Sequence, residues 1–192
     1  MKSRRFMLSL GVVLLSLSAL AFAQSEVQKS EVPKSDAQKS FDQLKTLAGS
    51  WQGPVTMVPP QADMDMNKPM QVSLRVTSKG NALVHEMQEA GTPLDAERYD
   101  HPVTMLYLDS DRLTLVHYCD AGNRPRMTGK ASPDGKKVEF EFADLSGGNN
   151  YGHMYHAVFT TIDADHHTED WTYMMPGDKP MHAHMDLTRS KQ

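Results

Sequence analysis

The stretch "LAGSWQG", residues 47 to 53, marks the point where a helical pattern gives way to strands. Before it, residues 40 to 43 (SFDQ) fit a capping box, in which a serine caps the first turn of a helix and a glutamine reaches back. Apolar side chains then recur at helical spacing at Phe41, Leu44 and Leu47. Gly49 is a favourable place for the helix to end. The pattern predicts one short helix with a single apolar face, suited to closing the end of another structure.

After Trp51, almost every segment has the pattern of a β-strand. Side chains two residues apart share a face of a strand, and apolar residues alternate in this way along most of the chain. The predicted strands are 51–58, 71–78, 82–89, 103–109, 112–119, 126–131, 136–142, 153–162, 167–174 and 181–189. Turn-forming clusters separate them, and no helical stretch long enough to connect parallel strands lies between them. We therefore predict an all-β fold, an up-and-down antiparallel barrel of about ten strands preceded by a short helix.

Residues 1–23 have the pattern of a secretory signal peptide. Its basic start contains Lys2, Arg4 and Arg5. Residues 6–20 form an apolar segment that is too short for a stable membrane span, and residues 21–23 (AFA) fit the small-x-small rule for cleavage. We expect the mature chain to begin at Gln24 and to be exported, either to a periplasm or out of the cell. No membrane anchor is expected after cleavage.

The segment that follows, residues 24–40, is predicted to be a disordered linker. It contains the five-residue repeat SEVQK-SEVPK-SDAQK, which is rich in serine, lysine and acidic residues and offers almost nothing to bury. The barrel domain is then expected to occupy residues 41–189, which is ample for one domain with its own core.

Charge and cysteine content narrow the classes of partner. The whole chain has 20 basic and 24 acidic residues, and the signal peptide carries three of the basic ones and no acidic one, so the mature chain has 17 against 24, a net charge of −7. This balance argues against nucleic acid or an anionic membrane as a partner. The single cysteine, Cys119, excludes an intrachain disulfide. Its thiol is either buried and inert, paired with another chain, or a ligand.

Several motifs together resemble a known superfamily. The Gly-x-Trp of "LAGSWQG", at a helix–strand junction, and Arg189 in "DLTRS" resemble the calycin superfamily, which includes lipocalins and fatty-acid-binding proteins. The strings "TSKGNALVHEM", "HYCDAGNRPRM", "GHMYHAVF" and "EDWTYM" look like a bacterial lipocalin-like family of unknown function. A more distant similarity is to nitrobindin-like barrels, which hold haem through a histidine. The resemblance implies a barrel with one closed end, where Arg189 lies over Trp51, and one open mouth that often holds a small apolar ligand.

A ligand site is predicted at the mouth of this barrel. We expect His117, Arg126 and His153 to supply its few polar contacts and Trp171 to form an apolar wall. Glu86 is a candidate partner for Arg126 inside the barrel, and Cys119 is expected at the edge of the site. Cationic and donor groups on an apolar wall would suit an apolar or amphipathic anion.

Two other functions stay open at this point. Clustered methionines and histidines in "MDMNKPM" and "MMPGDKPMHAHM" are typical of soft-metal capture, which makes copper or haem binding an alternative, although methionine also fills barrel interiors. The second alternative is a structural or interaction domain whose barrel is filled. No convincing catalytic set is present, so an enzymatic activity and a cofactor are left undecided. The remaining histidines, His166, His167, His182 and His184, are predicted to lie at the surface.

Overall fold

The computed structural model describes residues 33–60 and 68–190. Their elements are α1 (Asp36–Lys45), β1 (Gly49–Gly53), β2 (Val55–Val58), β3 (Met70–Thr77), the 3₁₀ turn η1 (Ser78–Gly80), β4 (Ala82–Glu89), β5 (Val103–Asp109), β6 (Arg112–Tyr118), β7 (Arg124–Ala131), β8 (Lys137–Ser146), β9 (His153–Thr161), β10 (His166–Met175) and β11 (Lys179–Arg189). Within the described part of the chain, no helix is long and apolar enough to cross a membrane.

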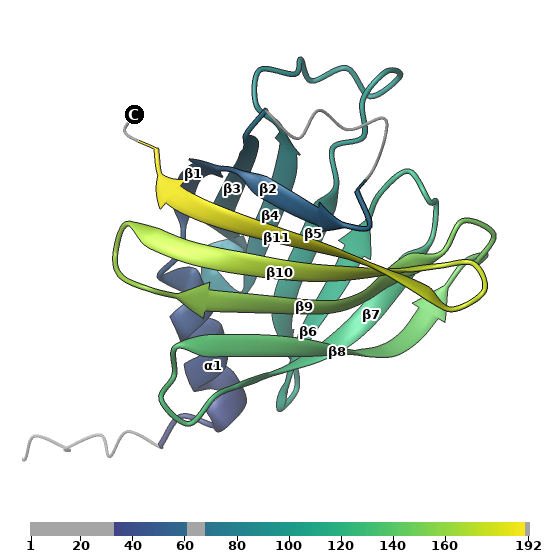
Figure 1. Ribbon diagram of the computed structural model, residues 1–192. Coiled ribbons are helices and arrows are strands. Elements are labelled where there is room, and N and C mark those ends of the chain that lie inside the picture. Colours follow the sequence, from purple (N-terminus) through teal and green to yellow (C-terminus); the bar gives the residue numbers. More distant parts are fainter. Residues whose placement is uncertain (1–32, 61–67, 191–192) are drawn as a thin grey trace, which may run out of the picture. The chain divides into compact units, whose positions relative to one another are not determined.

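The strands form one closed antiparallel barrel (Figure 1). From β3 to β11 each strand pairs with the next along the chain, and β1 pairs with both β3 and β11, which closes the sheet. Pro54 interrupts the first strand because it has no N–H to donate, and β2 continues along β11 beyond it. Counting β1 and β2 as one interrupted strand gives the ten-stranded, up-and-down, all-β barrel with a short N-terminal helix that the sequence predicts.

The helix begins five residues earlier than the sequence pattern indicated. Ser35, not Ser40, is the N-cap, and its side chain accepts a hydrogen bond from the backbone N–H of Gln38 at 3.2 Å. Ser40 instead lies inside the helix and donates to the Asp36 carbonyl at 2.7 Å. The Ser-x-x-Gln pattern begins at Ser35 as well as at Ser40, and the copy at Ser35 starts the helix, which also lets Ala37 pack against the core. The ordered fold therefore extends into the predicted linker, while the signal peptide and the rest of the linker lie outside the described residues.

Helix α1 packs its apolar face against one end of the barrel. Phe41 and Leu44 are buried in the same cluster as core residues of the sheet, and α1 contacts β3, β5, β6 and β7. Figure 1 shows the helix lying along the lower part of the barrel, close to the β7–β8 turn. This end of the barrel is closed, as the single apolar face of the helix predicts.

Trp51 and Arg189 seal the closed end together. Trp51 is fully buried and donates from Nε1 to the Leu47 carbonyl at 2.8 Å. The Arg189 guanidinium lies 4.0 Å from the centroid of the Trp51 ring and donates to the Ala48 carbonyl at 2.9 Å, which confirms the predicted pairing. Gly49 has φ +143°, and a Cβ there would come within 2.3 Å of an Arg189 nitrogen. Only glycine therefore leaves room for the guanidinium beside the tryptophan.

Replacing Trp51 by alanine should lower the free energy of unfolding by about 3 kcal/mol or more, because it empties the closed end and leaves Arg189 without its ring. Denaturant-induced unfolding measures the change. Tyr118→Ala, which removes an exposed aromatic side chain from β6, is the matched control and should cost much less. A loss below about 1 kcal/mol for Trp51→Ala would contradict the structural role given to this residue.

Candidate functional site

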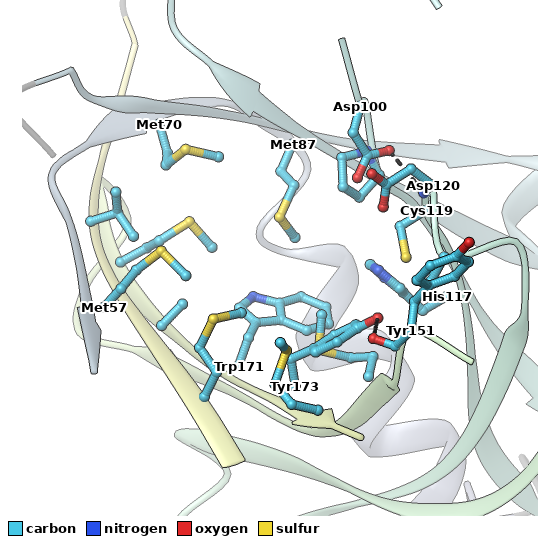
Figure 2. A pocket seen from close by; sticks show the side chains of 18 residues that line it. Met57, Met70, Met87, Asp100, His117, Cys119, Asp120, Tyr151, Trp171 and Tyr173 are labelled. Carbon is cyan, nitrogen blue, oxygen red and sulfur yellow. Dashed lines mark hydrogen bonds between the residues drawn. The ribbon is translucent and has the colours of Figure 1, made fainter. Parts of the chain in front are cut away.

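The other end of the barrel holds a cavity of about 700 Å³. It lies between the ends of the strands that are remote from α1, where β2, β6 and β10 end and β3 and β11 begin (Figure 2). Its wall is formed by Val55, Met57, Met70, Met87, Asp100, Pro102, His117, Cys119, Asp120, Ala121, Tyr151, Met154, Trp171, Tyr173, Met175, Met181, Ala183 and Met185. A volume of this size is in the range of small-molecule sites.

Methionine is the dominant residue of this wall. Seven methionines line the cavity: Met57, Met70, Met87, Met154, Met175, Met181 and Met185. Their thioether side chains surround the cavity on several sides in Figure 2. Methionine has three rotatable bonds and a polarisable sulfur, so such a wall can adapt to differently shaped apolar groups.

One side of the cavity is polar and is built around His117. This side chain is 1% exposed, and its Nδ1 lies 2.8 Å from the Thr104 hydroxyl, which is also buried. Burial, followed by the charge of nearby His85, lowers the pKa of His117 from 6.5 to about 3. The imidazole is therefore neutral at neutral pH. Its ring also lies 5.8 Å from that of Trp171, so the two together form the inner part of the cavity wall.

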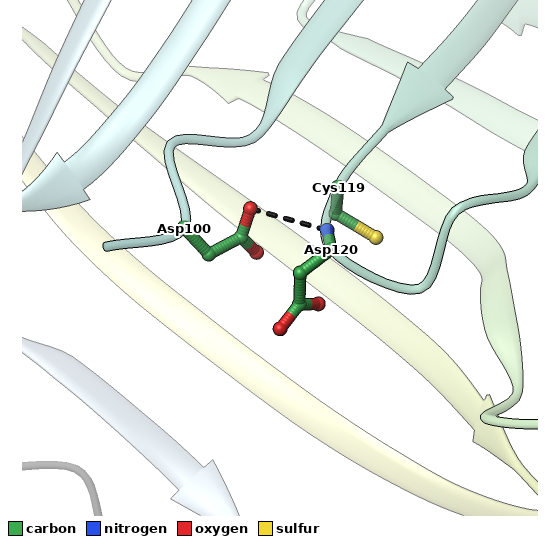
Figure 3. Close-up of side chains that lie close together, drawn as sticks. All are labelled: Asp100, Cys119 and Asp120. Atoms are coloured by element: carbon green, nitrogen blue, oxygen red, sulfur yellow. Dashed lines mark hydrogen bonds between the residues drawn. The ribbon is translucent and has the colours of Figure 1, made fainter. Parts of the chain in front are cut away.

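Asp100, Cys119 and Asp120 form a compact group at the mouth of the cavity that His117 also lines (Figure 3). Their two carboxylates and the thiol lie within 4.8 Å of one another, and Asp100 accepts the backbone N–H of Asp120 at 3.2 Å. Burial raises the pKa of the Cys119 thiol, and the two aspartates add to the rise. Loss of hydration at the cavity mouth, although Asp100 is partly accessible to solvent, and the charge of Asp120 also raise the pKa of Asp100. Burial first, and then this acidic group, raises the pKa of Tyr173 to about 12.

A fully buried carboxylate lies below the cavity, at Glu169. It accepts hydrogen bonds from His85 Nε2 at 2.9 Å, His167 Nε2 at 3.0 Å and Trp171 Nε1 at 2.9 Å. Burial alone would raise the pKa of Glu169, but the two histidines and their hydrogen bonds outweigh it and hold that pKa below its ordinary range. Glu169 is thus an ionised group whose oxygens are satisfied inside the barrel.

The sequence analysis missed this buried network. The prediction that His167 lies at the surface is wrong, since it is fully buried and packs edge-on against Trp51 with ring centroids 4.2 Å apart. The strict alternation of buried residues His167, Glu169 and Trp171 along β10 was the available signal. Polar residues at inward positions did not suggest a core, because buried charges are rare unless they are paired.

Three of the six predicted site residues line the cavity. His117, Cys119 and Trp171 do so, as predicted. Arg126 does not: it lies outside, with Nε donating to Asp144 at 3.0 Å and Nη1 3.9 Å from Asp109. Alternation along β7 buries its neighbours Pro125 and Met127 and turns Arg126 outward, while the register shift at this point places an extra residue, Ala143, in β8.

Glu86 and His153 are also outside the cavity wall. Glu86 is exposed, because Leu83, His85 and Met87 take the inward positions of β4. Pairing between β9 and β10 shifts at Tyr155, so that Met154 faces the cavity. His153 instead places Nδ1 2.9 Å from Asn149 Oδ1. The predicted convergence of His117, Arg126 and His153 is therefore wrong.

Comparison with known proteins identifies a structure with a similar fold and assigns no activity. No protein-family model and no curated protein matches the chain. Among solved structures, Rv2717c from M. tuberculosis has a TM-score of 0.55 at 15% identity, with 79% of this chain and 98% of that chain covered. A protein of unknown function from the DUF3598 family of Nostoc punctiforme gives a TM-score of 0.40 at 11% identity, and this chain spans 48% of its length. The similarity to Rv2717c shows a shared barrel fold.

Acid should destabilise the protein in part through His117. Because its pKa is lower in the folded protein than in the unfolded chain, the unfolded chain alone takes up this proton as the pH falls below 6.5. The free energy of unfolding should therefore fall by about 1.4 kcal/mol per pH unit between about pH 6 and pH 4 on account of this residue. Urea unfolding at several pH values should show that His117→Gln lacks this part of the slope.

The control for this measurement is His182→Gln, which removes an exposed histidine from β11. It should leave the acid slope close to that of the wild type. Equal slopes for His117→Gln and the wild type would show that His117 is protonated alike in the folded and unfolded states.

Proposed function

We propose that this protein is an exported, small-molecule-binding barrel of the calycin type, which takes up an apolar or amphipathic molecule. The observation that carries the proposal is the cavity of about 700 Å³ at one end of the barrel, walled mainly by methionine and aromatic side chains. Such a wall offers apolar contact to a ligand, and the few polar groups on one side can orient it. Trp51 and Arg189, which close the opposite end, support the relation to calycins.

The charges at the cavity favour a neutral or cationic head group. The sequence hypothesis of an anionic ligand depended on Arg126, which pairs with Asp144 on the outside. Among the described residues, none that lines the cavity is lysine or arginine, whereas Asp100 and Asp120 are at its mouth. An anion would meet these carboxylates without a counter-charge, and a cation would be attracted to them and to the nearby aromatic rings.

Of the two alternatives, metal or haem binding has the better support. The seven methionine thioethers of the wall suit Cu(I), and the neutral His117 imidazole is of the kind that binds metals and haem iron. Visible absorption and metal analysis of the purified protein would identify either group. The filled-barrel alternative is disfavoured, because the described residues leave a cavity large enough for a small molecule.

Export is supported by the sequence of the first 23 residues, with its basic start, apolar segment and Ala-Phe-Ala. When the full chain is expressed in a bacterial host, the exported fraction should contain a mature form that begins at Gln24. Intact-mass measurement and N-terminal sequencing of that fraction test this. Recovery of the uncleaved chain from the cytoplasm alone would contradict export.

The binding proposal predicts that N-phenyl-1-naphthylamine, an uncharged fluorescent probe, binds the chelator-treated mature protein. Ala183→Phe places a ring where Ala183 now lines the cavity, and should weaken binding about tenfold or more, because the ring occupies the space of the ligand. Arg126→Ala, on the outside of the barrel, is the matched control and should leave the affinity within about twofold. Fluorescence titration measures both, and equal affinity in wild type and Ala183→Phe would overturn the assignment of the cavity.

Competition by two amphiphiles of equal chain length tests the head group. Decyltrimethylammonium should displace the probe at lower concentration than decanoate, and Asp100→Asn or Asp120→Asn should reduce that preference. A stronger effect of decanoate would revive the anionic hypothesis while leaving the cavity itself as the binding site.

A further inference from the structure

We propose that Asp100, His117, Cys119 and Asp120 form a binding site for a divalent cation of the Zn²⁺ type at the mouth of the barrel. The site goes beyond the small-molecule function and does not depend on it. It combines one thiol, one imidazole and two carboxylates, and all four residues line the same cavity. Sulfur, nitrogen and oxygen from these three residue types are the ligands that Zn²⁺ takes in proteins.

The first support is the spacing of the ligand atoms. One carboxylate oxygen from each aspartate and the Cys119 sulfur all lie within 4.8 Å of one another. Bonds of about 2.0–2.3 Å to a shared tetrahedral ion would bring such atoms to about 3–4 Å, so small side-chain rotations suffice. Asp100 and Asp120 are exposed and can make them. The Asp100 carboxylate is already tied to the β6–β7 turn by the N–H of Asp120, which holds the two segments together (Figure 3).

The second, independent support is the state of His117. The side chain is 1% exposed, and within the described part of the chain only its Nδ1 has a hydrogen-bond partner, the Thr104 hydroxyl. Nε2 is left on the side of the cavity that His117 lines together with Asp100, Cys119 and Asp120. Histidines that bind metals are commonly held in this way, with the other ring nitrogen donating to a fixed acceptor. Donation from Nδ1–H to Thr104 leaves the Nε2 lone pair for the ion.

The charges of Asp100, Cys119 and Asp120 also favour binding of a cation. Two carboxylates and a thiol are crowded together, and in the described residues neither Asp100 nor Asp120 forms an ion pair with a lysine or arginine. When a divalent ion binds, the Cys119 sulfur gives up its proton to water and donates an electron pair to the metal. The ion then offsets the repulsion between the carboxylates.

A second cluster of two carboxylates, on the outside of the barrel, provides a comparison. On the outside of β8 and β9, His156 Nε2 lies 3.0 Å from Glu139 and 3.7 Å from Glu141. The imidazole there already contacts both carboxylates, so these two groups have a protein partner without an ion. At the mouth, no lysine, arginine or histidine of the described residues forms an ion pair with Asp100 or Asp120, so the two clusters give a matched comparison.

Titration of the chelator-treated mature protein with Co²⁺ tests the proposal, because a Co²⁺–thiolate bond produces a charge-transfer band in the near ultraviolet. The expected result is one Co²⁺ per chain with this band, displaced by Zn²⁺. Cys119→Ser should abolish the band, and Asp100→Asn, Asp120→Asn and His117→Gln should each weaken binding about tenfold or more. Glu139→Gln, in the outer cluster, should change neither the band nor the affinity.

Thr104→Val tests whether the Thr104 hydroxyl positions the His117 ring for metal binding. The substitution removes the hydrogen-bond partner of His117 Nδ1 and keeps the shape of the residue 104 side chain. It should weaken Co²⁺ binding by about 10–100-fold without abolishing the thiolate band. The proposal is overturned if stoichiometric Co²⁺ gives no thiolate band, or if the exposed-site variants Asp100→Asn and Asp120→Asn bind Co²⁺ as the wild type does. Binding of N-phenyl-1-naphthylamine to the same variants reports separately on the cavity and on folding, so failure of the metal site and failure of the small-molecule function are distinguishable.

Discussion

The buried carboxylate of Glu169 is the constraint on which the interior of the barrel depends. A charge with no solvent contact is tolerated only when its oxygens are fully hydrogen-bonded, and removing one partner from such a group typically costs about 3–5 kcal/mol. Here three ring N–H groups, from His85, His167 and Trp171, meet that need. Each ring must keep its orientation for the carboxylate to stay ionised, so one acidic residue fixes three side chains that come from two strands.

Those fixed rings connect the closed end to the cavity. The edge of His167 packs on Trp51, which carries Arg189 over its face, while Trp171 forms the floor of the cavity next to His117. Because a carboxylate only accepts, His85 and His167 both present Nε2–H to Glu169. Their Nδ1 atoms are buried without a partner among the described residues, which is a cost that the network carries. The result is a buried, hydrogen-bonded polar layer between the closed end and the cavity.

The alternation of apolar and polar residues, together with the turn-forming residues, was sufficient to predict the barrel from the sequence. Side chains of a closed sheet must alternate between core and solvent along every strand. The same rule located His117 and Cys119 on the cavity wall. It failed for His153, since the extra residue Tyr155 in β9 reverses the alternation there and leaves no local signal. Arg126 follows the alternation, between the buried Pro125 and Met127, so the error was to assign it an inward position. The alternation of His167 with Glu169 and Trp171 was present, but polar side chains are buried only where partners satisfy them, and the closed sheet alone brings those partners together. Polar groups that satisfy one another across strands are therefore the part of this protein least accessible from one-dimensional patterns.

The floor and the walls of the cavity differ in the conformational freedom of their side chains. This difference affects which ligands the site can discriminate. Its floor is Trp171, whose Nε1 is held by Glu169, beside His117, which is held by Thr104. Its walls are methionines, which change rotamer at little cost. Under the proposed function, the walls would accept apolar groups of similar size with little regard to shape, so discrimination would fall to the polar side. There Asp100 and Asp120 carry negative charge at the mouth, and selection by charge follows more directly from this arrangement than selection by shape.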